Sequence, residues 1–521
     1  MHQESAHNNA AWFLLDRNIE EGGAKRPALH SGDKSISYAE VQREVNRLGN
    51  ALLKQGLGIE DRVFLLSTDI PELVYALLGS MKIGAVPVVA NIMLPPKDIS
   101  YILNDCRARI AVVHEALFPI FSEARKELRH LKTVVVIGQV DGETAYSEFV
   151  RSADTELAAT AVSPDDSAVW QYSSGTTGAP KGVIQMHHNI ERHSLRIAKG
   201  IWQATKTDRV LSVAKLFFGY GQGNQIYIPF SVGASTVLLA ERPTPDVVAG
   251  TITKYRPTIF CGVPTSFHGI LHLPNLGKDY DFSSVRFATS AGEALPESII
   301  KAWTETFGHE IVDGLGSTEC FHIFISNRQK DITPGSIGRP IDGFEVKLVD
   351  EKGLELEDGQ LGNLMVRGDS FAAGYWNKCD MTRRTFLGEW VRTGDKAYRD
   401  EKGNYWFSGR GDDMIKAGGI WVSPVEVESA VLQHPQVFEC CVVGARDKEG
   451  LEKPKAYVVL AAGVEGSEGL TREIQAFVKA KIAPYKYPRW IEYVTKLPKT
   501  ATGKLQRYKL RDKNFVPSNV R

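Results

Sequence analysis

The feature that most constrains this fold is a regular alternation of short apolar stretches with amphipathic ones. From residue 62 to 137, apolar runs alternate with segments of helical periodicity. The strands that we expect there are Val63–Ser67, Val86–Ala90, Ile110–His114 and Thr133–Ile137. A second series of the same kind runs from Val210 to Thr289. Short apolar strands that alternate with helices predict mostly parallel sheets covered on both faces, that is, a doubly wound α/β fold.

The pattern changes towards the C-terminus. From about residue 331, short strands separated by turns predict a β-rich subdomain of a large N-terminal domain that spans 1–409. Residues 410–413 contain glycine and aspartate without apolar periodicity, which is typical of a hinge. Ser423 and Glu426 have the spacing of a capping box, so a helix should begin at Pro424. Residues 414–521 therefore read as a small α+β C-terminal domain.

The composition excludes some partners. Lys plus Arg and Asp plus Glu number 62 each, so the formal net charge is zero and no nucleic-acid partner is indicated. The N-terminus lacks a basic region followed by an apolar one, and Lys82, Pro87 and Asn91 interrupt the most apolar stretch. The six cysteines show no metal-ligand spacing. We expect a cytoplasmic protein with reduced thiols and no membrane contact.

Residues 172–182 read YSSGTTGAPKG and carry the first chemical signal. Gly175 and Gly178 permit a tight turn, while hydroxyls, free backbone N–H groups and Lys181 suit an anion. We expect this loop to join a strand to a helix that begins at His187, as phosphate-binding loops do. Lys181 is followed by Gly182, so it is not the common P-loop. The candidate phosphate-binding residues are Ser173, Ser174, Gly175, Thr176, Thr177, Gly178 and Lys181.

Further motifs follow other predicted strands. Residues 215–223, 290–293 and 313–319 all come at the carboxyl ends of predicted strands, where open parallel sheets bind ligands. Residues 392–395 (RTGD) and 497–507 (LPKTATGKLQR) add a carboxylate and a cluster of cations. A carboxylate has two oxygens and suits a vicinal diol.

Together with 172–182, these motifs resemble the adenylate-forming superfamily of acyl-CoA synthetases, luciferases and peptide-synthetase adenylation domains. The resemblance implies that a carboxylate attacks the α-phosphate of MgATP, which gives an acyl-adenylate and pyrophosphate. A thiol then displaces AMP. The implied cofactors are ATP, Mg²⁺ and coenzyme A.

The resemblance also implies residue roles around the nucleotide. Asp313 and Gly314 would lie beside adenine, with the loop of Gly292 and Glu293. Thr318 would contact the α-phosphate and Glu319 would hold Mg²⁺. The ribose would be held by Asp395 and Arg410.

Roles in the C-terminal domain follow from the same resemblance. Lys504 would contact the carboxylate and the α-phosphate, where a cation favours the developing negative charge. The domain would then rotate about Asp412, and Lys416, Gly418, Gly419 and Trp421 would line a passage for the pantetheine arm of CoA.

Within the superfamily the chain looks most like the benzoate-CoA ligase group, notably at 215–221, 316–324, 419–424 and 484–488. An aromatic-walled slot for a flat ring would be formed by Phe218, Gly219, Tyr220, Leu315, Gly316, His322 and Ile323. Leu315 stands where the superfamily usually has Tyr. Benzoate ligases usually have Ala where this chain has Gly219. Without that methyl group there would be space beside the ring for a substituent, so we hypothesise benzoate itself or a ring-substituted benzoate such as 2-aminobenzoate or a hydroxybenzoate.

Several points stay open at this stage. A stand-alone ligase that loads a pantetheinyl carrier protein is one alternative, and a catalytically silent nucleotide-binding protein is another. Peptide-synthetase adenylation domains bind the α-ammonium group of an amino acid with an Asp in the region after the 210–214 strand. This chain has Lys215 and aromatic residues there and no acidic residue before Glu241, which disfavours an α-amino acid substrate. The sequence allows a monomer or a homodimer, and it does not decide whether Lys504 is acylated.

Overall fold

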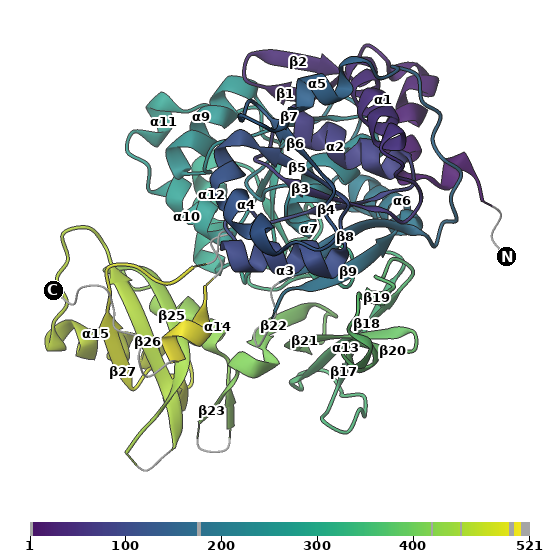
Figure 1. Ribbon diagram of the computed structural model, residues 1–521. Coiled ribbons are helices and arrows are strands. Elements are labelled where there is room, and N and C mark those ends of the chain that lie inside the picture. The colour runs from purple at the N-terminus through teal and green to yellow at the C-terminus, as the bar shows by residue number, and fades with distance from the viewer. Residues whose placement is uncertain (1–3, 174–178, 418–419, 449–450, 500–504, 512–521) are drawn as a thin grey trace.

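A computed structural model describes residues 4–173, 179–417, 420–448, 451–499 and 505–511 (Figure 1). Two large sheets with helices around them occupy the upper part of Figure 1, and two smaller β-containing regions lie below them. The predicted α/β class is confirmed.

The first sheet contains strands from the first predicted α/β series. Its order is β19-β9-β8-β4-β3-β5-β6-β7, and β8, β4, β3, β5, β6 and β7 run parallel to their neighbours within that group. Only β9 and β19 are antiparallel. The strands are β3 (Arg62–Leu66), β4 (Val86–Val89), β5 (Ile110–His114), β6 (Thr133–Ile137), β7 (Thr144–Ala145), β8 (Ser167–Ser173), β9 (Lys181–Met186) and β19 (Gly374–Tyr375).

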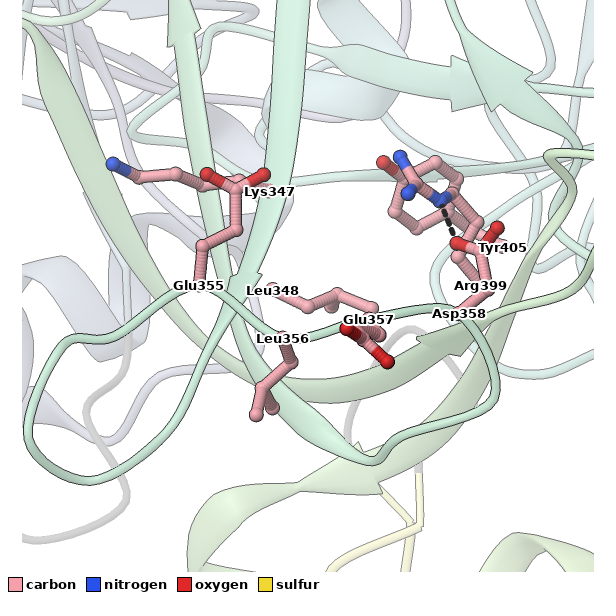
Figure 2. Close-up of a pocket in the computed structure, with 8 residues that line it drawn as sticks. All are labelled: Lys347, Leu348, Glu355, Leu356, Glu357, Asp358, Arg399 and Tyr405. Carbon is pink, nitrogen blue, oxygen red and sulfur yellow. Dashed lines mark hydrogen bonds and ion pairs between the residues drawn. The ribbon is translucent and has the colours of Figure 1, made fainter.

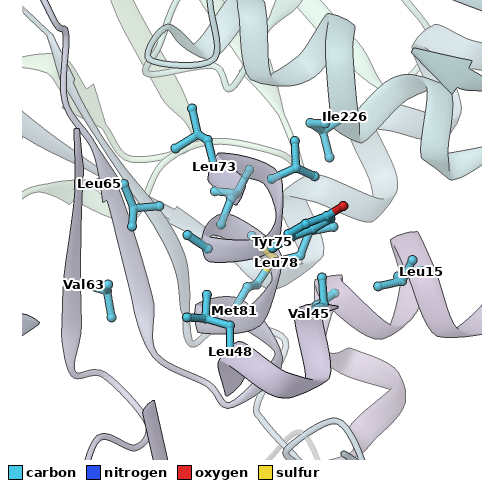
Figure 3. Packing of buried hydrophobic residues seen from close by; sticks show 14 of the residues in the cluster. Leu15, Val45, Leu48, Val63, Leu65, Leu73, Tyr75, Leu78, Met81 and Ile226 are labelled. Atoms are coloured by element: carbon cyan, nitrogen blue, oxygen red, sulfur yellow. The ribbon is translucent and has the colours of Figure 1, made fainter. Parts of the chain in front are cut away.

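Helices around this sheet are α1 (Tyr38–Lys54), α2 (Pro71–Lys82), α3 (Pro96–Cys106), α4 (Phe118–Ala124) and α5 (Tyr146–Arg151). Every residue of α2 from Leu73 to Lys82 is buried, as expected for a helix enclosed on all sides. Figure 3 shows why: α2 lies between α1, which contributes Val45 and Leu48, and β3, which contributes Val63 and Leu65. Ser37 caps α1 in a capping box with Glu40.

The second sheet has the order β16-β15-β14-β13-β12-β10-β11-β1-β2 and is parallel from β14 to β1. Its strands are β1 (Pro27–Ser31), β2 (Lys34–Ser37), β10 (Arg209–Ser212), β11 (Ser235–Val237), β12 (Ile259–Gly262), β13 (Phe287–Ser290), β14 (Ile311–Gly316), β15 (Ile323–Ser326) and β16 (Arg339–Pro340). The helices between its strands are α7 (Gly219–Gln222), α8 (Ile228–Ser231), α9 (Pro245–Tyr255), α10 (Pro264–Leu271), α11 (Leu276–Asp279) and α12 (Glu297–Phe307). Helix α6 (His187–Leu195) precedes them and contacts β8 and β9 of the first sheet.

The β-rich region forms a five-stranded sheet in which β17, β18, β21 and β20 follow one another and β22 pairs with β21. Its elements are β17 (Phe344–Val349), β18 (Gly362–Gly368), α13 (Cys379–Thr385), β20 (Phe386–Leu387), β21 (Trp390–Arg399) and β22 (Tyr405–Arg410). Every pairing in this sheet is antiparallel.

The C-terminal region follows a short 3₁₀ turn, Gly411–Asp413. A two-stranded ribbon of β23 (Ile415–Ala417) and β24 (Ile420–Val422) precedes a three-stranded sheet of β25 (Val437–Arg446), β26 (Glu452–Leu460) and β27 (Trp490–Tyr493). The helices are α14 (Pro424–Val431), α15 (Glu468–Lys481) and α16 (Arg507–Arg511). Ser423 caps α14 by accepting from the Glu426 N–H, as the sequence predicts. The role of 410–413 as a hinge stays a prediction.

Two local predictions were wrong. Lys181–Met186 form strand β9, which pairs antiparallel with β8, so the 172–182 loop joins two strands rather than a strand and a helix. The segment contains Val183 and Ile184, which favour strands, and α6 begins only after it. Strand β14 also continues through Asp313 to Gly316, because Gly314 and Leu315 pair with β15.

No helix among the described residues is both long enough and apolar enough to cross a bilayer. Five of the six cysteines are buried and Cys379 is exposed, and all are free thiols.

Candidate functional site

Three side chains from distant parts of the chain meet at the end of the β8–β9 hairpin. Lys181 Nζ donates to Glu319 Oε1 and to the Tyr375 hydroxyl, each at 2.8 Å. The Tyr375 hydroxyl in turn donates to Glu319 Oε1 at 2.6 Å. We call Lys181, Glu319 and Tyr375 the Lys181 cluster. Tyr375 reaches it because β19 pairs with β9, opposite Val183 and next to Lys181.

The cluster holds Glu319 as a carboxylate. Burial alone would raise the pKa of Glu319, but the adjacent Lys181 ammonium and the Tyr375 hydrogen bond lower it below its ordinary value. Burial raises the pKa of Tyr375, so its hydroxyl stays protonated and able to donate. An ionised oxygen ligand beside a lysine suits a site where a divalent cation and phosphates arrive together.

Metal binding here would rest on few protein ligands. Among the described residues, no group of three or more His, Cys, Asp or Glu side chains could hold a metal ion. Mg²⁺ keeps several waters and commonly takes only one or two carboxylates besides substrate phosphates. Glu319 fits that donor set as a single carboxylate, if a bound metal ion replaces Lys181 as the partner of its oxygen.

A second charged pair lies on neighbouring strands of the β-rich sheet. Asp395 on β21 is directly opposite Arg410 on β22, and Arg410 Nη1 donates to Asp395 Oδ1 at 3.1 Å. Arg410 Nη1 also donates to the Thr393 carbonyl at 3.0 Å. Burial raises the pKa of Asp395, and the Arg410 charge opposes that rise. The sequence-predicted ribose residues are therefore in contact with each other.

The predicted adenine-side residues come from two neighbouring strands. Asp313 on β14 pairs with Ser290 at the end of β13, and Gly292 follows with φ +94°. Asp313 is 3% exposed, and burial raises the pKa of its carboxyl to about 8. A side chain at Gly314 would meet the Ile325 carbonyl at 2.8 Å, so glycine permits the β14–β15 pairing there.

The C-terminal region contacts this edge directly. The Leu505 N–H donates to Glu293 Oε1 at 2.9 Å, which links the 497–507 motif to the loop after β13. A second contact lies between Phe438 on β25 and His268 on α10, with ring centroids 4.7 Å apart. The C-terminal domain thus packs against the same edge that carries Asp313 and Gly292.

The predicted aryl residues centre on His322. Its ring stacks on Tyr220 with centroids 5.2 Å apart, and a side chain at Gly223 would lie 2.4 Å from His322 Cδ2. A side chain at Gly316 would lie 2.3 Å from the His322 carbonyl oxygen. We call Tyr220, Gly223, Gly316 and His322 the His322 cluster. Burial lowers the pKa of His322 to about 4, so its imidazole is neutral at pH 7.

The other predicted aryl residues divide between two cores. Tyr220, Leu315 and Ile323 pack in the same apolar cluster as the β15 strand, whereas Phe218 packs in the cluster around α2. Gly219 lies between Phe218 and Tyr220, and a side chain there would meet the Gln171 carboxamide, with Oε1 at 2.9 Å. The space that a side chain at position 219 would occupy is therefore next to the Gln171 carboxamide.

One turn joins the Lys181 cluster to the His322 cluster. Residues 316–322 connect β14 to β15, and the Ser317 N–H donates to the His322 carbonyl at 3.2 Å. Thr318 and Glu319 lie inside this turn, and Gln185 on β9 donates to the Thr318 carbonyl at 2.6 Å. The β8–β9 hairpin thus brings Lys181 to Glu319, and the β14–β15 hairpin carries Thr318 and Glu319 together with His322, on which Tyr220 of α7 stacks.

The predicted CoA-passage residues lie elsewhere. Lys416 and Trp421 are paired on the β23–β24 ribbon, with Lys416 Nζ 5.5 Å from the Trp421 ring centroid. Both side chains are exposed, and β23 lies at the lower edge of Figure 1, away from the two large sheets. Asp412 is exposed in the 3₁₀ turn before them.

Several predicted residues lie outside the described part of the chain. They are Ser174, Gly175, Thr176, Thr177, Gly178, Gly418, Gly419 and Lys504. Their neighbours Ser173, Lys181 and Leu505 are described.

Two family models match the sequence. The AMP-binding enzyme model matches residues 15–376, and the model of the AMP-binding enzyme C-terminal domain matches residues 426–504. The first alone spans more than half of the chain. The chain belongs to the AMP-binding enzyme family.

This AMP-binding enzyme has similar relatives over nearly its whole length. It is 43% identical to a benzoate–CoA ligase of Thauera aromatica, with 96% of this chain and 95% of that protein covered. It matches the crystal structure of the anthranilate CoA ligase AuaEII in complex with anthranoyl-AMP at 42% identity and a TM-score of 0.94, covering 98% and 97% of the two chains. A benzoate CoA ligase from Burkholderia xenovorans LB400 matches at 42% identity and a TM-score of 0.90, covering 97% and 100%.

Sequence reasoning about this AMP-binding enzyme missed Tyr375 and Gln171. Tyr375 is 56 residues from Glu319, and only the β19–β9 pairing brings them together. Its one local signal is the preceding Gly374, whose φ of +143° is a glycine conformation. Gln171 lies just before the 172–182 motif and is not part of it, although a buried glutamine inside an apolar strand is itself unusual.

The hollow in Figure 2 is not a candidate for the AMP-binding enzyme's substrate. It lies in the β-rich sheet beside Leu348, Arg399 and Tyr405, and its volume of about 10 Å³ suits roughly one water molecule. None of the sequence-predicted site residues lines it.

Proposed function

We propose that the protein is an AMP-forming ligase that joins an aromatic carboxylic acid to the thiol of coenzyme A. The observation that carries the proposal is the 316–322 turn, which belongs to both the Lys181 cluster and the His322 cluster. A carboxylate between these clusters would have cationic and phosphate-binding groups on one side and neutral aromatic groups on the other. The full-length similarity to benzoate and anthranilate ligases supports the same substrate class.

In the first step, a carboxylate oxygen of the acid attacks the α-phosphorus of ATP. The bond from that phosphorus to the oxygen that bridges to the β-phosphate breaks, and pyrophosphate leaves. Lys181 would bind phosphate oxygens, and Thr318 would bind the α-phosphate. Lys504 would contact the acid and the α-phosphate, where fixed positive charge stabilises the developing negative charge. Glu319 would hold Mg²⁺, which when bound neutralises phosphate charge.

In the second step, the CoA sulfur attacks the carbonyl carbon of the aryl-adenylate. The bond from that carbon to the phosphate oxygen breaks, AMP leaves and the thioester forms. Asp395 would accept hydrogen bonds from the ribose hydroxyls, and Arg410 would orient Asp395 through their 3.1 Å contact. The exposed Lys416–Trp421 ribbon would have to move to the site, by rotation of the C-terminal domain about Asp412.

A substrate panel tests the proposal. We expect ATP-dependent thioester formation with CoA to be most efficient for benzoate or its amino and hydroxy derivatives, because a flat ring buries well against Tyr220 and His322. The measurement is kcat/KM for benzoate, 2-aminobenzoate, 4-hydroxybenzoate and hexanoate, with AMP release as the readout. A preference for hexanoate would contradict the aromatic assignment, and thioester formation only with a holo carrier protein would contradict CoA as the acceptor.

A further inference from the structure

A buried glutamine next to the His322 cluster has one half of its carboxamide without a partner. Gln171 lies on β8 and is 5% exposed. Its Nε2 donates to Gln222 Oε1 at 3.0 Å, but its Oε1 has no hydrogen-bond partner in the described part of the chain. A buried carbonyl oxygen without a donor is unfavourable, because it has lost its hydrogen bonds to water. Buried polar groups of this kind commonly have a functional reason.

The surroundings decide which end of the carboxamide is free. Gln222 Oε1 also accepts a hydrogen bond from the Tyr227 hydroxyl at 2.9 Å. Both Gln222 and Tyr227 are buried, at 1% and 0% exposure. Because Gln222 Oε1 receives two donors, Gln171 presents its Nε2 to Gln222 and turns its Oε1 away from it.

The free oxygen faces Gly219. A β-carbon built at position 219 would lie 2.9 Å from Gln171 Oε1 and 3.2 Å from Nε2. Any side chain at 219 would therefore displace this carboxamide. Gly219 is the first residue of α7, and the next residue, Tyr220, stacks on His322. The acceptor thus lies at the start of the helix that carries one wall of the proposed ring-binding site.

We propose that Gln171 and Gly219 form a specificity element for a ring substituent that carries a hydrogen-bond donor, either an amino or a hydroxyl group. The inference rests on the proposed function. The donor of the substituent would give Gln171 Oε1 the partner that the protein chain does not supply, and Gly219 would leave the oxygen uncovered by a methyl group. A site that must satisfy a buried polar group favours ligands that carry the matching group.

Matched pairs of acids test the proposal on the wild-type enzyme. Aminobenzoates and methylbenzoates are similar in size but differ in donor capacity, so the comparison is made at the ortho, meta and para positions, with hydroxybenzoates as a further arm. We expect kcat/KM for the donor-bearing acid to exceed that for its methyl counterpart by about tenfold at one ring position. Ratios near one at all three positions would overturn the proposal without any variant.

Variants locate the effect. Gln171→Met keeps length but removes the carbonyl, so it should reduce the donor-to-methyl ratio to near one. Gly219→Ala should lower the same ratio by displacing the Gln171 carboxamide. This variant replaces Gln171→Met in the test if Gln171→Met does not fold. Gln433→Met, on an exposed glutamine of the C-terminal domain, should keep the wild-type ratio. An unchanged ratio in folded Gln171→Met would overturn the proposal.

The outcomes separate this inference from the proposed function. If no aromatic acid supports ATP-dependent thioester formation, the proposed function fails. If aromatic acids are activated but amino and methyl counterparts react equally well, only the role of Gln171 and Gly219 fails.

Discussion

The two ends of the site control the charge of their side chains in opposite ways. In the Lys181 cluster, Glu319 stays ionised because an ammonium and a hydroxyl contact it, each within 2.8 Å. In the His322 cluster, the imidazole stays neutral because it is buried, and burial lowers its pKa to about 4. One end keeps its charges by pairing them, whereas the other excludes charge.

This contrast matches the two halves of an aryl-adenylate. The phosphate is anionic and needs compensating charges, whereas the ring is uncharged and gains most from removal from water. The 316–322 turn belongs to both clusters, so a change at one end is expected to reach the other mainly through this short segment. Variants at the charged end should therefore affect the chemical step, and variants at the aryl end should affect acid choice.

The largest effect is expected from Lys504→Ala. Loss of this cation should lower acid-dependent pyrophosphate release by about a thousandfold or more, because developing charge loses its main stabilisation. Conversion of supplied aryl-AMP and CoA to thioester should remain near the wild-type rate, since that step does not need Lys504. Single-turnover assays of the two half-reactions make the measurement. Equal loss in both steps would contradict the separate roles of Lys504 and the Lys416 ribbon.

A smaller effect is expected from Glu319→Gln. The neutral amide should lower kcat/KM for ATP by about a hundredfold, because it loses both the ion pair with Lys181 and the Mg²⁺ ligand. Titration with Mg²⁺ should show that higher metal concentration recovers part of the activity. Glu345→Gln, on an exposed glutamate paired with Arg367, is the matched control and should behave like wild type.

Tyr375→Phe isolates one hydrogen bond of the same cluster. Removal of the hydroxyl should lower kcat/KM for ATP by about tenfold, equivalent to about 1.4 kcal/mol, with little change in the ratio between acids. Tyr398→Phe, which removes the hydroxyl of a ring stacked on Trp406, is the control. If Tyr375→Phe changed the ratio of kcat/KM between acids more than it changed kcat/KM for ATP, the Lys181 cluster would not act separately from the His322 cluster.

The smallest effect concerns stability at the aryl end. Because the folded-state pKa of His322 is about 4, below its ordinary 6.5, the unfolded chain binds more protons as pH falls through this range. The free energy of unfolding should thus decrease between pH 6.5 and 4. His322→Gln should reduce the drop in Tm between pH 7.5 and 5 by about one to two degrees, which is what about 1–2 kcal/mol produces in a chain of 521 residues. Exposed His130→Gln should show the wild-type drop, and an equal drop in both variants would contradict burial as the cause.

Much of the fold was predictable because its strands are short apolar runs with clear boundaries. Strands β5 and β6 have the predicted bounds, and β3 and β4 differ from theirs by at most one residue at each end. The charged residues of the site were predictable because motifs place them. Strand β9 was missed because a glycine-rich loop before a helix suggested a phosphate loop, and the pairing that makes Lys181–Met186 a strand is with β8 and β19.

The partners of the motif residues were harder to predict. Tyr375 and Gln171 contribute through contacts with residues 56 and 51 positions away, and no local periodicity reports such contacts. The sequence also suggested that Gly219 opens space beside a ring, whereas the nearest atoms to a side chain there belong to Gln171. Long-range pairing, rather than local propensity, decides these details.

The most direct test of the account is exchange of labelled pyrophosphate into ATP by the wild-type enzyme, without CoA. We predict exchange that requires an aromatic carboxylic acid and Mg²⁺ and is much faster with benzoate or a substituted benzoate than with hexanoate. Exchange that is independent of acid, or absent with every aromatic acid tested, would contradict a site that joins a phosphate-binding end to an aryl-binding end.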